Sequence, residues 1–154
     1  MRLSEILDAG AIRVFPKVGS KKRLFCELGD VAESAYGLDA KAVFSALQER
    51  ESLGPTGVGD GIALPHARLP GLEAVHGVFA RLETPLEFEA LDRKPVDLVF
   101  ALFAPEGAGV SHLKALALVS RTLRDQALCA KLRANGDPAI LYALLTEAEA
   151  SQAA

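Results

Sequence analysis

His66 has the clearest chemical setting of any residue in this chain. It comes directly after Pro65, and glycines at positions 54, 57, 59 and 61 precede it. A neutral imidazole is a nucleophile, a proton carrier or a metal ligand near neutral pH. Pro65 fixes its own φ angle and so helps to hold the segment that presents the ring. From spacing alone, an unspecialised histidine at a strand end is the commoner interpretation.

The other two histidines differ in their surroundings. His112 stands where a helix is expected to begin, and the free N–H groups of a helix N-terminus attract phosphate and favour a neutral imidazole. In isolation, the same position also fits an exposed residue in a helix cap. His76 lies inside an expected strand without a neighbouring acid or glycine loop, so we interpret it as structural.

The glycine-rich segment 54–61 fits two structures. Repeated glycines allow positive φ angles and let backbone N–H groups approach an anion closely, but a long turn of unusual geometry needs them too. The segment lacks the Gly-Lys-Ser/Thr ending of a Walker A motif, which disfavours nucleotide binding. No Ser/His/Asp triad or carboxylate pair stands out, and a metal hydrolase would lack a convincing third ligand.

Composition limits the class of protein. The chain has 154 residues, half of them apolar, which fits a single domain (1–154) with a core over about 3–146. The net charge of -3 gives no attraction to nucleic acid. The first residues do not form a signal peptide, and the longest apolar stretch, 98–104, falls short of the ~20 residues that span a bilayer. We therefore expect a cytoplasmic protein that is not embedded in a membrane, with Cys26 and Cys129 reduced and mostly packed.

Hydrophobic periodicity predicts how these residues are positioned. Apolar residues at helical spacing predict a helix over 24–35 that ends at Gly37, and Asp39 is the expected N-cap of a second helix that reaches Arg50. Ser111 is the expected N-cap of a third helix, and Asp137-Pro138 begins a fourth that ends near 145.

Strands are expected at 62–64, 75–82 and 96–103, with the last nearly all apolar and therefore central. We expect the Ala-rich residues 147–154 to fray. Together these elements predict an α/β fold, a single-domain mixed β-sheet flanked by α-helices.

The residue identities of the motif around His66 are more informative than the spacing of its histidine and glycines. Residues 50–66, Arg-Glu-Ser-Leu-Gly-Pro-Thr-Gly-Val-Gly-Asp-Gly-Ile-Ala-Leu-Pro-His, resemble the active-site segment of enzyme IIA proteins of the bacterial phosphoenolpyruvate-dependent phosphotransferase system. The similar branch is the fructose/mannitol type, which includes the nitrogen-regulatory IIA proteins. Segments 82–88 and 95–102 agree with it, as does His112 at a helix start. The resemblance covers nearly the whole chain, about 3–145.

The resemblance implies a phosphohistidine carrier that needs no cofactor or metal. His66 would be the phosphorylated nucleophile, His112 would assist beside it, and Arg50 and Thr56 would line the pocket. An arginine offers a planar, permanently charged fork to phosphate oxygens. The glycine segment and the helix start would add N–H donors.

Three positions depart from the family pattern. Asp60 and Ala67 stand where Asn and Gly are expected, and Pro55 takes the place of a residue that is often small and polar. Asp60 would place a negative charge near the phosphoryl group and make the phosphorylated state slightly less favourable. None of the three removes a proposed catalytic group.

The resemblance also implies partners. The phosphoryl donor would be an HPr-like phosphocarrier of the nitrogen branch, and the phosphorylation state would regulate targets such as potassium transporters or sensor kinases. The chain holds no transmembrane segment or second domain, so we favour this regulatory branch. The alternative is a stand-alone sugar IIA that passes the phosphoryl group to a IIB domain. A third possibility is an interaction domain that has lost phosphorylation, which the joint presence of His66, His112 and Arg50 disfavours.

Overall fold

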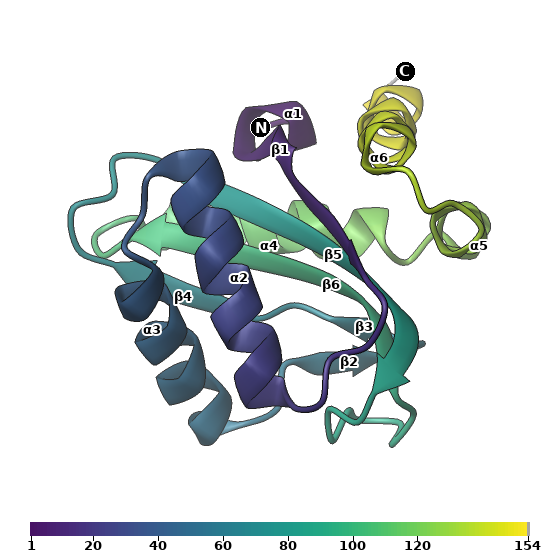
Figure 1. Cartoon of the computed structure of the whole chain (residues 1–154). Helices are drawn as coiled ribbons and strands as arrows, with labels where there is room; N and C mark the ends of the chain where they lie inside the picture. The colour runs from purple at the N-terminus through teal and green to yellow at the C-terminus, as the bar shows by residue number, and fades with distance from the viewer. Residues whose placement is uncertain (154) are drawn as a thin grey trace.

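The computed structural model describes the backbone of residues 1–153 and the side chains of residues 1–147. In this range a mixed sheet has the strand order β1-β5-β6-β3-β2, and β4 pairs with β6 off that path. Helices α2 and α3 lie on the near side of the sheet in Figure 1, and α4 lies behind it. The expected α/β fold, a mixed sheet flanked by helices, is confirmed.

The elements have the following bounds. The strands are β1 (Leu7–Phe15), β2 (Gly57–Gly59), β3 (Ile62–Ala63), β4 (His66–Leu69), β5 (His76–Leu86) and β6 (Val96–Pro105). The helices are α1 (Leu3–Ile6), α2 (Lys21–Tyr36), α3 (Ala40–Leu53), α4 (Gly109–Thr122), α5 (Gln126–Arg133) and α6 (Pro138–Ala153).

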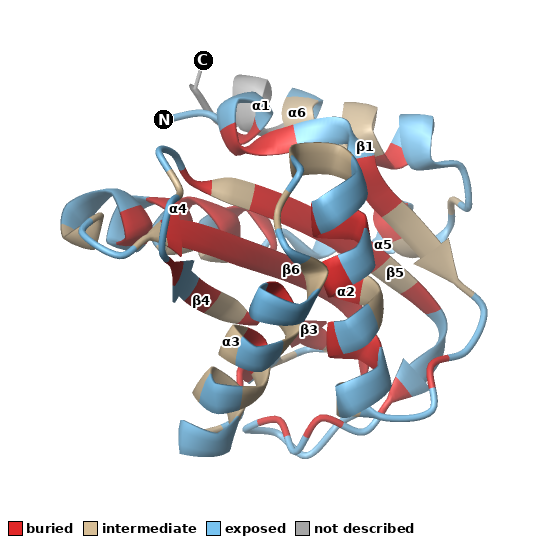
Figure 2. Ribbon diagram, turned by 60° about the vertical axis from the view of Figure 1, so that its left-hand side comes forward, coloured by how far each residue is buried: buried red, intermediate tan, exposed pale blue. Residues whose placement is uncertain are grey.

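Strand β6 forms the centre of the core. It pairs with β5 on one side and with β3 and β4 on the other. Residues 98–104 are all buried, and Figure 2 shows this buried stretch along the strand. An almost continuous apolar run is typical of a strand covered on both faces, so the prediction of a central strand at 96–103 is confirmed.

The first two long helices form where the sequence predicts them, although α2 begins before residue 24, at Lys21, and α3 runs past Arg50 to Leu53. Gly37 follows α2 with φ +70°, the left-handed conformation that ends many helices. Asp39 precedes α3, but its side chain makes no capping hydrogen bond. Glu33 Oε2 accepts a hydrogen bond from the Ala40 N–H at 3.2 Å instead. The expected capping contact of Asp39 is therefore wrong, although the helix starts where predicted.

Helix α4 begins earlier than predicted. Its first residue is Gly109 and its N-cap position is Ala108, so Ser111 lies inside the first turn and is not the N-cap. The Ser111 N–H already donates to the Ala108 carbonyl oxygen at 2.7 Å. His112 still lies in the first turn, but it is buried rather than exposed.

The C-terminal helix begins as predicted but runs further. Asp137 Oδ1 accepts a hydrogen bond from the Ala139 N–H at 2.9 Å, as expected of a capping residue before Pro138. The helix continues past residue 145 to Ala153. Fraying of 147–154 stays a prediction, because the side chains of 148–154 and all of Ala154 lie outside the described residues.

Strand β1 and helix α5 were not predicted from the sequence. Between Leu7 and Ile12 the pairing of β1 with β5 shifts in register, and residues 8–10 are exposed. This irregular edge strand lacks the simple alternation that identifies strands. Both cysteines are free as expected, but Cys26 is exposed rather than packed.

Candidate functional site

His66 begins β4, and hydrogen bonds position both its chain segment and its ring. The carbonyl oxygen of Pro65 accepts a hydrogen bond from the Leu102 N–H at 2.9 Å, which ties this segment to β6. The ring Nδ1 lies 2.9 Å from the Leu64 carbonyl oxygen. Because a carbonyl only accepts, Nδ1 must carry the proton in the neutral ring. The lone pair of His66 is therefore on Nε2.

Arg50 approaches that lone pair from the last turn of α3. Its Nε donates to His66 Nε2 at 3.3 Å, and its Nη1 donates to the Gly54 carbonyl oxygen at 2.9 Å. Nη2 has no hydrogen-bond partner among the described residues, and it remains available to an anion. The guanidinium thus lies beside the atom that would carry a phosphoryl group.

His112 faces His66 across a pocket. The ring centroids are 5.4 Å apart and the ring planes make an angle of 68°. His112 Nδ1 accepts a long hydrogen bond of 3.5 Å from Arg68 Nε, which leaves the proton of the neutral ring on Nε2. This Nε2 is buried without a partner in the described part of the chain, and only 5 % of the residue is exposed. An unpaired buried donor is costly and requires an explanation.

Both rings are biased toward the neutral form. Burial lowers the pKa of His66 below its ordinary value, and the positive charge of Arg50 adds to this, while the Leu64 carbonyl acts in the opposite direction. Burial also lowers the pKa of His112, with further contributions from His66 and Arg68. At neutral pH the site therefore presents two neutral imidazoles between two arginines.

We call this cavity of about 550 Å³ the His66 pocket. The residues that line it come from α3, β4 and α4, and they are Ala46, Glu49, Arg50, Leu53, His66, Ala67, Arg68, His112, Leu113 and Leu116. Leu53 is 81 % exposed and Leu113 65 %, so the pocket has large apolar side chains accessible at its rim. Such a rim is typical of a protein-docking surface.

The structure brings His66, His112 and Arg50 together as expected, but Thr56 is not among the residues that line the pocket. The Thr56 side chain is buried, and its hydroxyl donates to Glu51 Oε1 at 2.5 Å. The predicted role of Thr56 in the pocket stays a prediction. Arg68 was not identified from the sequence, although it follows His66 by two residues on one strand and so shares its face.

The glycine segment forms a β-hairpin rather than an anion cradle at His66. Gly59, Asp60 and Gly61 make the turn between β2 and β3, all with positive φ angles. Gly57 is needed because a Cβ there would lie 2.7 Å from Ala90 Cβ. None of the glycines lines the His66 pocket, so the structure gives no support to the expected N–H donors from this segment. Asp60 does not line it either, so its predicted effect on a phosphoryl group is not supported.

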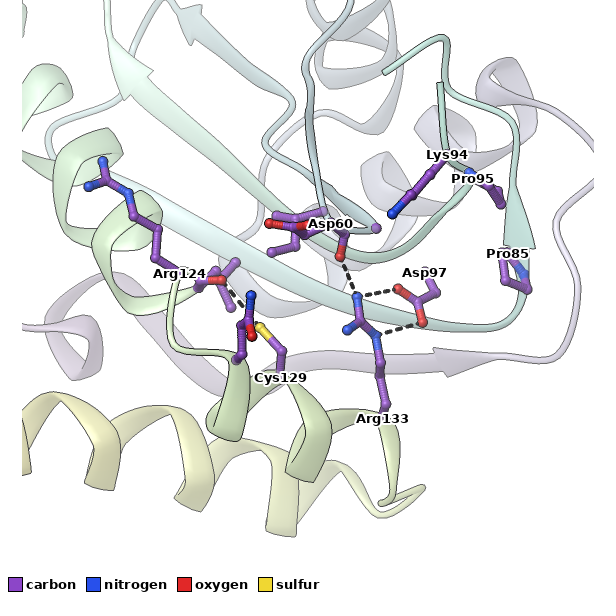
Figure 3. Close-up of a pocket in the computed structure, with 12 residues that line it drawn as sticks. Asp60, Pro85, Lys94, Pro95, Asp97, Arg124, Cys129 and Arg133 are labelled. Carbon is purple, nitrogen blue, oxygen red and sulfur yellow. Dashed lines mark hydrogen bonds and ion pairs between the residues drawn. The ribbon is translucent and has the colours of Figure 1, made fainter. Parts of the chain in front are cut away.

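The turn residues border a second cavity of about 490 Å³, which we call the Arg133 pocket (Figure 3). Arg133, at the end of α5, donates to both carboxylate oxygens of Asp97, at 2.9 Å and 3.0 Å, and to the Asp60 carbonyl oxygen at 2.7 Å. A Cβ at Gly61 would lie 2.6 Å from Arg133 Nη2. Glycine at this position therefore lets the guanidinium join α5, β6 and the hairpin.

The third histidine lies apart from these cavities. The ring of His76 stacks on Tyr36 with centroids 4.4 Å apart. The Tyr36 hydroxyl accepts a hydrogen bond from the Asp8 N–H and donates to the Gly77 carbonyl oxygen. This arrangement supports the structural interpretation of His76.

Among the described residues, no helix is both long enough and apolar enough to cross a membrane.

Residues 5–148 match the family described as phosphoenolpyruvate-dependent sugar phosphotransferase system, EIIA 2. The chain is 49 % identical over 145 residues to a nitrogen regulatory protein of Bradyrhizobium diazoefficiens, with 94 % of this chain and 95 % of the relative covered. It is 40 % identical over 151 residues to a nitrogen regulatory protein of Escherichia coli K12, covering 97 % and 92 %.

A solved structure, nitrogen regulatory protein IIA-Ntr of Neisseria meningitidis, superposes with a TM-score of 0.86 at 38 % identity, covering 94 % of this chain and 99 % of that one. Fold, site and sequence therefore lead to one conclusion: this chain belongs to the EIIA 2 family of the phosphoenolpyruvate-dependent phosphotransferase system.

Proposed function

We propose that this chain is a phosphohistidine carrier of the nitrogen-related phosphotransferase system, with His66 Nε2 as the phosphorylated atom. One observation carries the proposal: the Leu64 carbonyl holds the proton on Nδ1, so the lone pair is on Nε2, within the His66 pocket and next to Arg50 and His112. The nitrogen-regulatory relatives support this branch of the system.

Phosphoryl transfer at this site needs no metal and no proton transfer. The Nε2 lone pair forms the new nitrogen–phosphorus bond while the phosphorus–donor bond breaks, and the departing donor takes that electron pair. Nδ1 keeps its proton, and the Leu64 carbonyl stabilises the positive charge that develops on the ring. Positioning and charge stabilisation are the main requirements of such a loose transition state.

The surrounding side chains would stabilise the transferring group. Arg50 would exchange its contact with His66 Nε2 for contacts with phosphoryl oxygens, and its Nη2 is already unpaired. The buried N–H of His112 Nε2 would gain in a phosphoryl oxygen the acceptor that it lacks. Arg68 would hold the His112 tautomer that allows this.

We propose that an HPr-like phosphocarrier of the nitrogen branch is the donor and docks on the apolar rim formed by Leu53 and Leu113. The phosphorylation state would then regulate cytoplasmic target proteins, such as potassium transport systems or sensor kinases. A doubly charged group in the pocket beside the two leucines would change the local potential and disfavour apolar docking. Equal binding of every target by phosphorylated and unphosphorylated protein would contradict this regulation.

The alternative is a sugar-transport IIA component that passes the phosphoryl group to a IIB domain. The same His66 chemistry serves both roles, so they differ in the acceptor. Rapid transfer from the phosphorylated protein to a sugar-specific IIB domain, with no target regulated, would favour the alternative.

Labelled phosphoenolpyruvate, enzyme I and the nitrogen-branch phosphocarrier provide the test. We expect acid-labile, base-stable label on the wild-type protein and none on His66→Ala. His76→Ala is the matched control, because His76 lies outside the His66 pocket, and it should be labelled normally. An unlabelled wild type, or full label on His66→Ala, would overturn the proposal.

A further inference from the structure

Glu51 follows Arg50 in the last turn of α3 but takes part in a different set of contacts. Successive helix residues point about 100° apart, so Arg50 faces the His66 pocket while Glu51 faces Thr56. The Glu51 side chain is only 7 % exposed. A carboxylate withdrawn from water to this extent is costly unless its oxygens are paired.

The Glu51 oxygens are paired with three donors. They accept hydrogen bonds from the Thr56 hydroxyl at 2.5 Å and from the Thr56 N–H at 3.0 Å. Lys21 Nζ, at the start of α2, donates to Oε2 at 3.0 Å. Lys21 also lies 4.8 Å above the ring of Phe88. The carboxylate thus joins α2, α3 and the segment that leads to β2.

From Thr56 the contacts continue to the proposed nucleophile. The Thr56 carbonyl oxygen accepts a hydrogen bond from the Leu64 N–H at 3.0 Å. The carbonyl of the same Leu64 lies 2.9 Å from His66 Nδ1. All three polar groups of Thr56 are therefore engaged. They connect Glu51 to Leu64, whose carbonyl, together with Arg50, favours the proton on Nδ1 of His66.

We infer that Glu51 and Thr56 are positioning residues for His66, which fix the Leu64 carbonyl so that Nδ1 stays protonated and Nε2 keeps its lone pair. Neither residue lines the His66 pocket, so we place both behind it rather than in contact with the transferring group. Thr56 therefore lies behind the pocket. The expected change in the rate of phosphoryl transfer rests on the proposed function. The effect on the tautomer does not require phosphoryl transfer.

The tautomer is measured first, on unphosphorylated protein. In protein labelled with ¹⁵N at histidine, the chemical shifts of the two ring nitrogens distinguish the Nδ1–H from the Nε2–H form. We expect wild type and Thr56→Ser, which keeps the hydroxyl, to hold His66 as Nδ1–H. Thr56→Val, of similar shape but without the hydroxyl, and Glu51→Gln should show a mixture of both forms. An unchanged tautomer in both variants would overturn the inference.

The rate of transfer is measured second. A displacement of about 1 Å at a reacting group can cost about 10²-fold, so we expect Thr56→Val and Glu51→Gln to lower the maximal rate about tenfold with little change in KM for the donor. Thr56→Ser should transfer at close to the wild-type rate. Glu83→Gln, an exposed acid on β5, is the matched control and should change neither readout.

Two further results keep the inference testable. If Thr56→Val does not fold, Lys21→Met removes a donor from the outer end of the network and should shift the tautomer in the same direction. The double variant Glu51→Gln/Thr56→Val should lose less than the product of the single losses, because both act through one contact. Purely multiplicative losses would contradict a shared route. If wild type takes no label but the tautomer shifts as stated, the proposed function fails while the positioning role stands.

Discussion

The His66 pocket and the Arg133 pocket are similar in size, about 550 and 490 Å³, but their arginines are engaged differently. Arg133 donates three hydrogen bonds to Asp97 and the Asp60 backbone. Arg50 has a histidine nitrogen and one carbonyl as acceptors, and no carboxylate pairs with it among the described residues.

The polar groups beside the two arginines differ in the same way. In the His66 pocket the N–H of His112 Nε2 is buried without an acceptor, and burial lowers the pKa of both histidines. In the Arg133 pocket the hydrogen bond to Asp97 raises the pKa of Arg133, as in any satisfied ion pair. Unsatisfied polar groups, as in the His66 pocket, are typical of a binding site, and satisfied ones, as at Arg133, are typical of a structural contact.

Removal of each arginine tests this difference between the two pockets most strongly. Arg50→Ala should lower the rate of phosphoryl transfer about 10²-fold, because it removes a charged donor from the transferring group. Transfer assays at saturating donor measure this change. A rate within about twofold of wild type would mean that Arg50, like Arg133, is structural.

Removal of the unpaired histidine donor should have a smaller effect. His112→Ala should slow transfer about tenfold without abolishing label, because His112 assists and does not carry the phosphoryl group. His112→Gln, whose amide supplies an N–H, should recover part of the rate. Complete loss of label in both variants, with the fold intact by circular dichroism, would contradict an assisting role.

For the Arg133 pocket we expect a loss of stability without a loss of phosphoryl transfer. Arg133→Ala should lower the free energy of unfolding by about 1–2 kcal/mol, a modest loss for a charged group that is about one-third exposed. Urea unfolding measures it, and Lys131→Ala on the same helix is the control. Phosphoryl transfer by the folded variant should match wild type, and a large kinetic defect would show that the two pockets are not independent.

The smallest effect concerns pH. Because burial holds the pKa of His66 below its ordinary value of 6.5, the neutral ring persists at mildly acidic pH. Transfer should stay on a plateau above pH 6.5 and decline only as the pH falls through the lowered pKa. The unfolded state binds protons first, so the stability that the neutral ring contributes is present above pH 6.5 and is lost over the same acidic range.

A histidine NMR titration follows these pKa values directly. Arg68→Gln should raise the pKa of His112, because Arg68 is one of the groups that lowers it. A pKa of His66 above 6.5 would contradict the proposed neutral nucleophile.

The sequence predicted the central strand, the starts of α3 and α6, and the three residues that meet at the His66 pocket. Those predictions rested on local hydrophobic periodicity and on the resemblance of residues 50–66 to the family's active-site segment. The sequence did not predict strand β1, whose register with β5 is interrupted between Leu7 and Ile12. Nor did it reveal the contact of Arg68 with His112, because 44 residues separate them and only the packing of β4 and α4 brings them together.

The predicted role of the glycines shows the limit of a local pattern. Positive φ angles do occur at Gly59 and Gly61, as the sequence suggests. Whether such a turn binds an anion or accommodates a side chain depends on what lies opposite it. At Gly61 that group is Arg133, from helix α5 much further along the chain.

The most direct test of the central claim is to locate the phosphorus atom in the phosphorylated protein. In protein labelled with ¹⁵N at histidine, coupling between phosphorus and nitrogen identifies the bonded atom. We predict phosphorus on Nε2 of His66, with His76 and His112 unmodified and Nδ1 of His66 still hydrogen-bonded to the Leu64 carbonyl. Phosphorus on Nδ1 of His66, or on His112, would contradict the account.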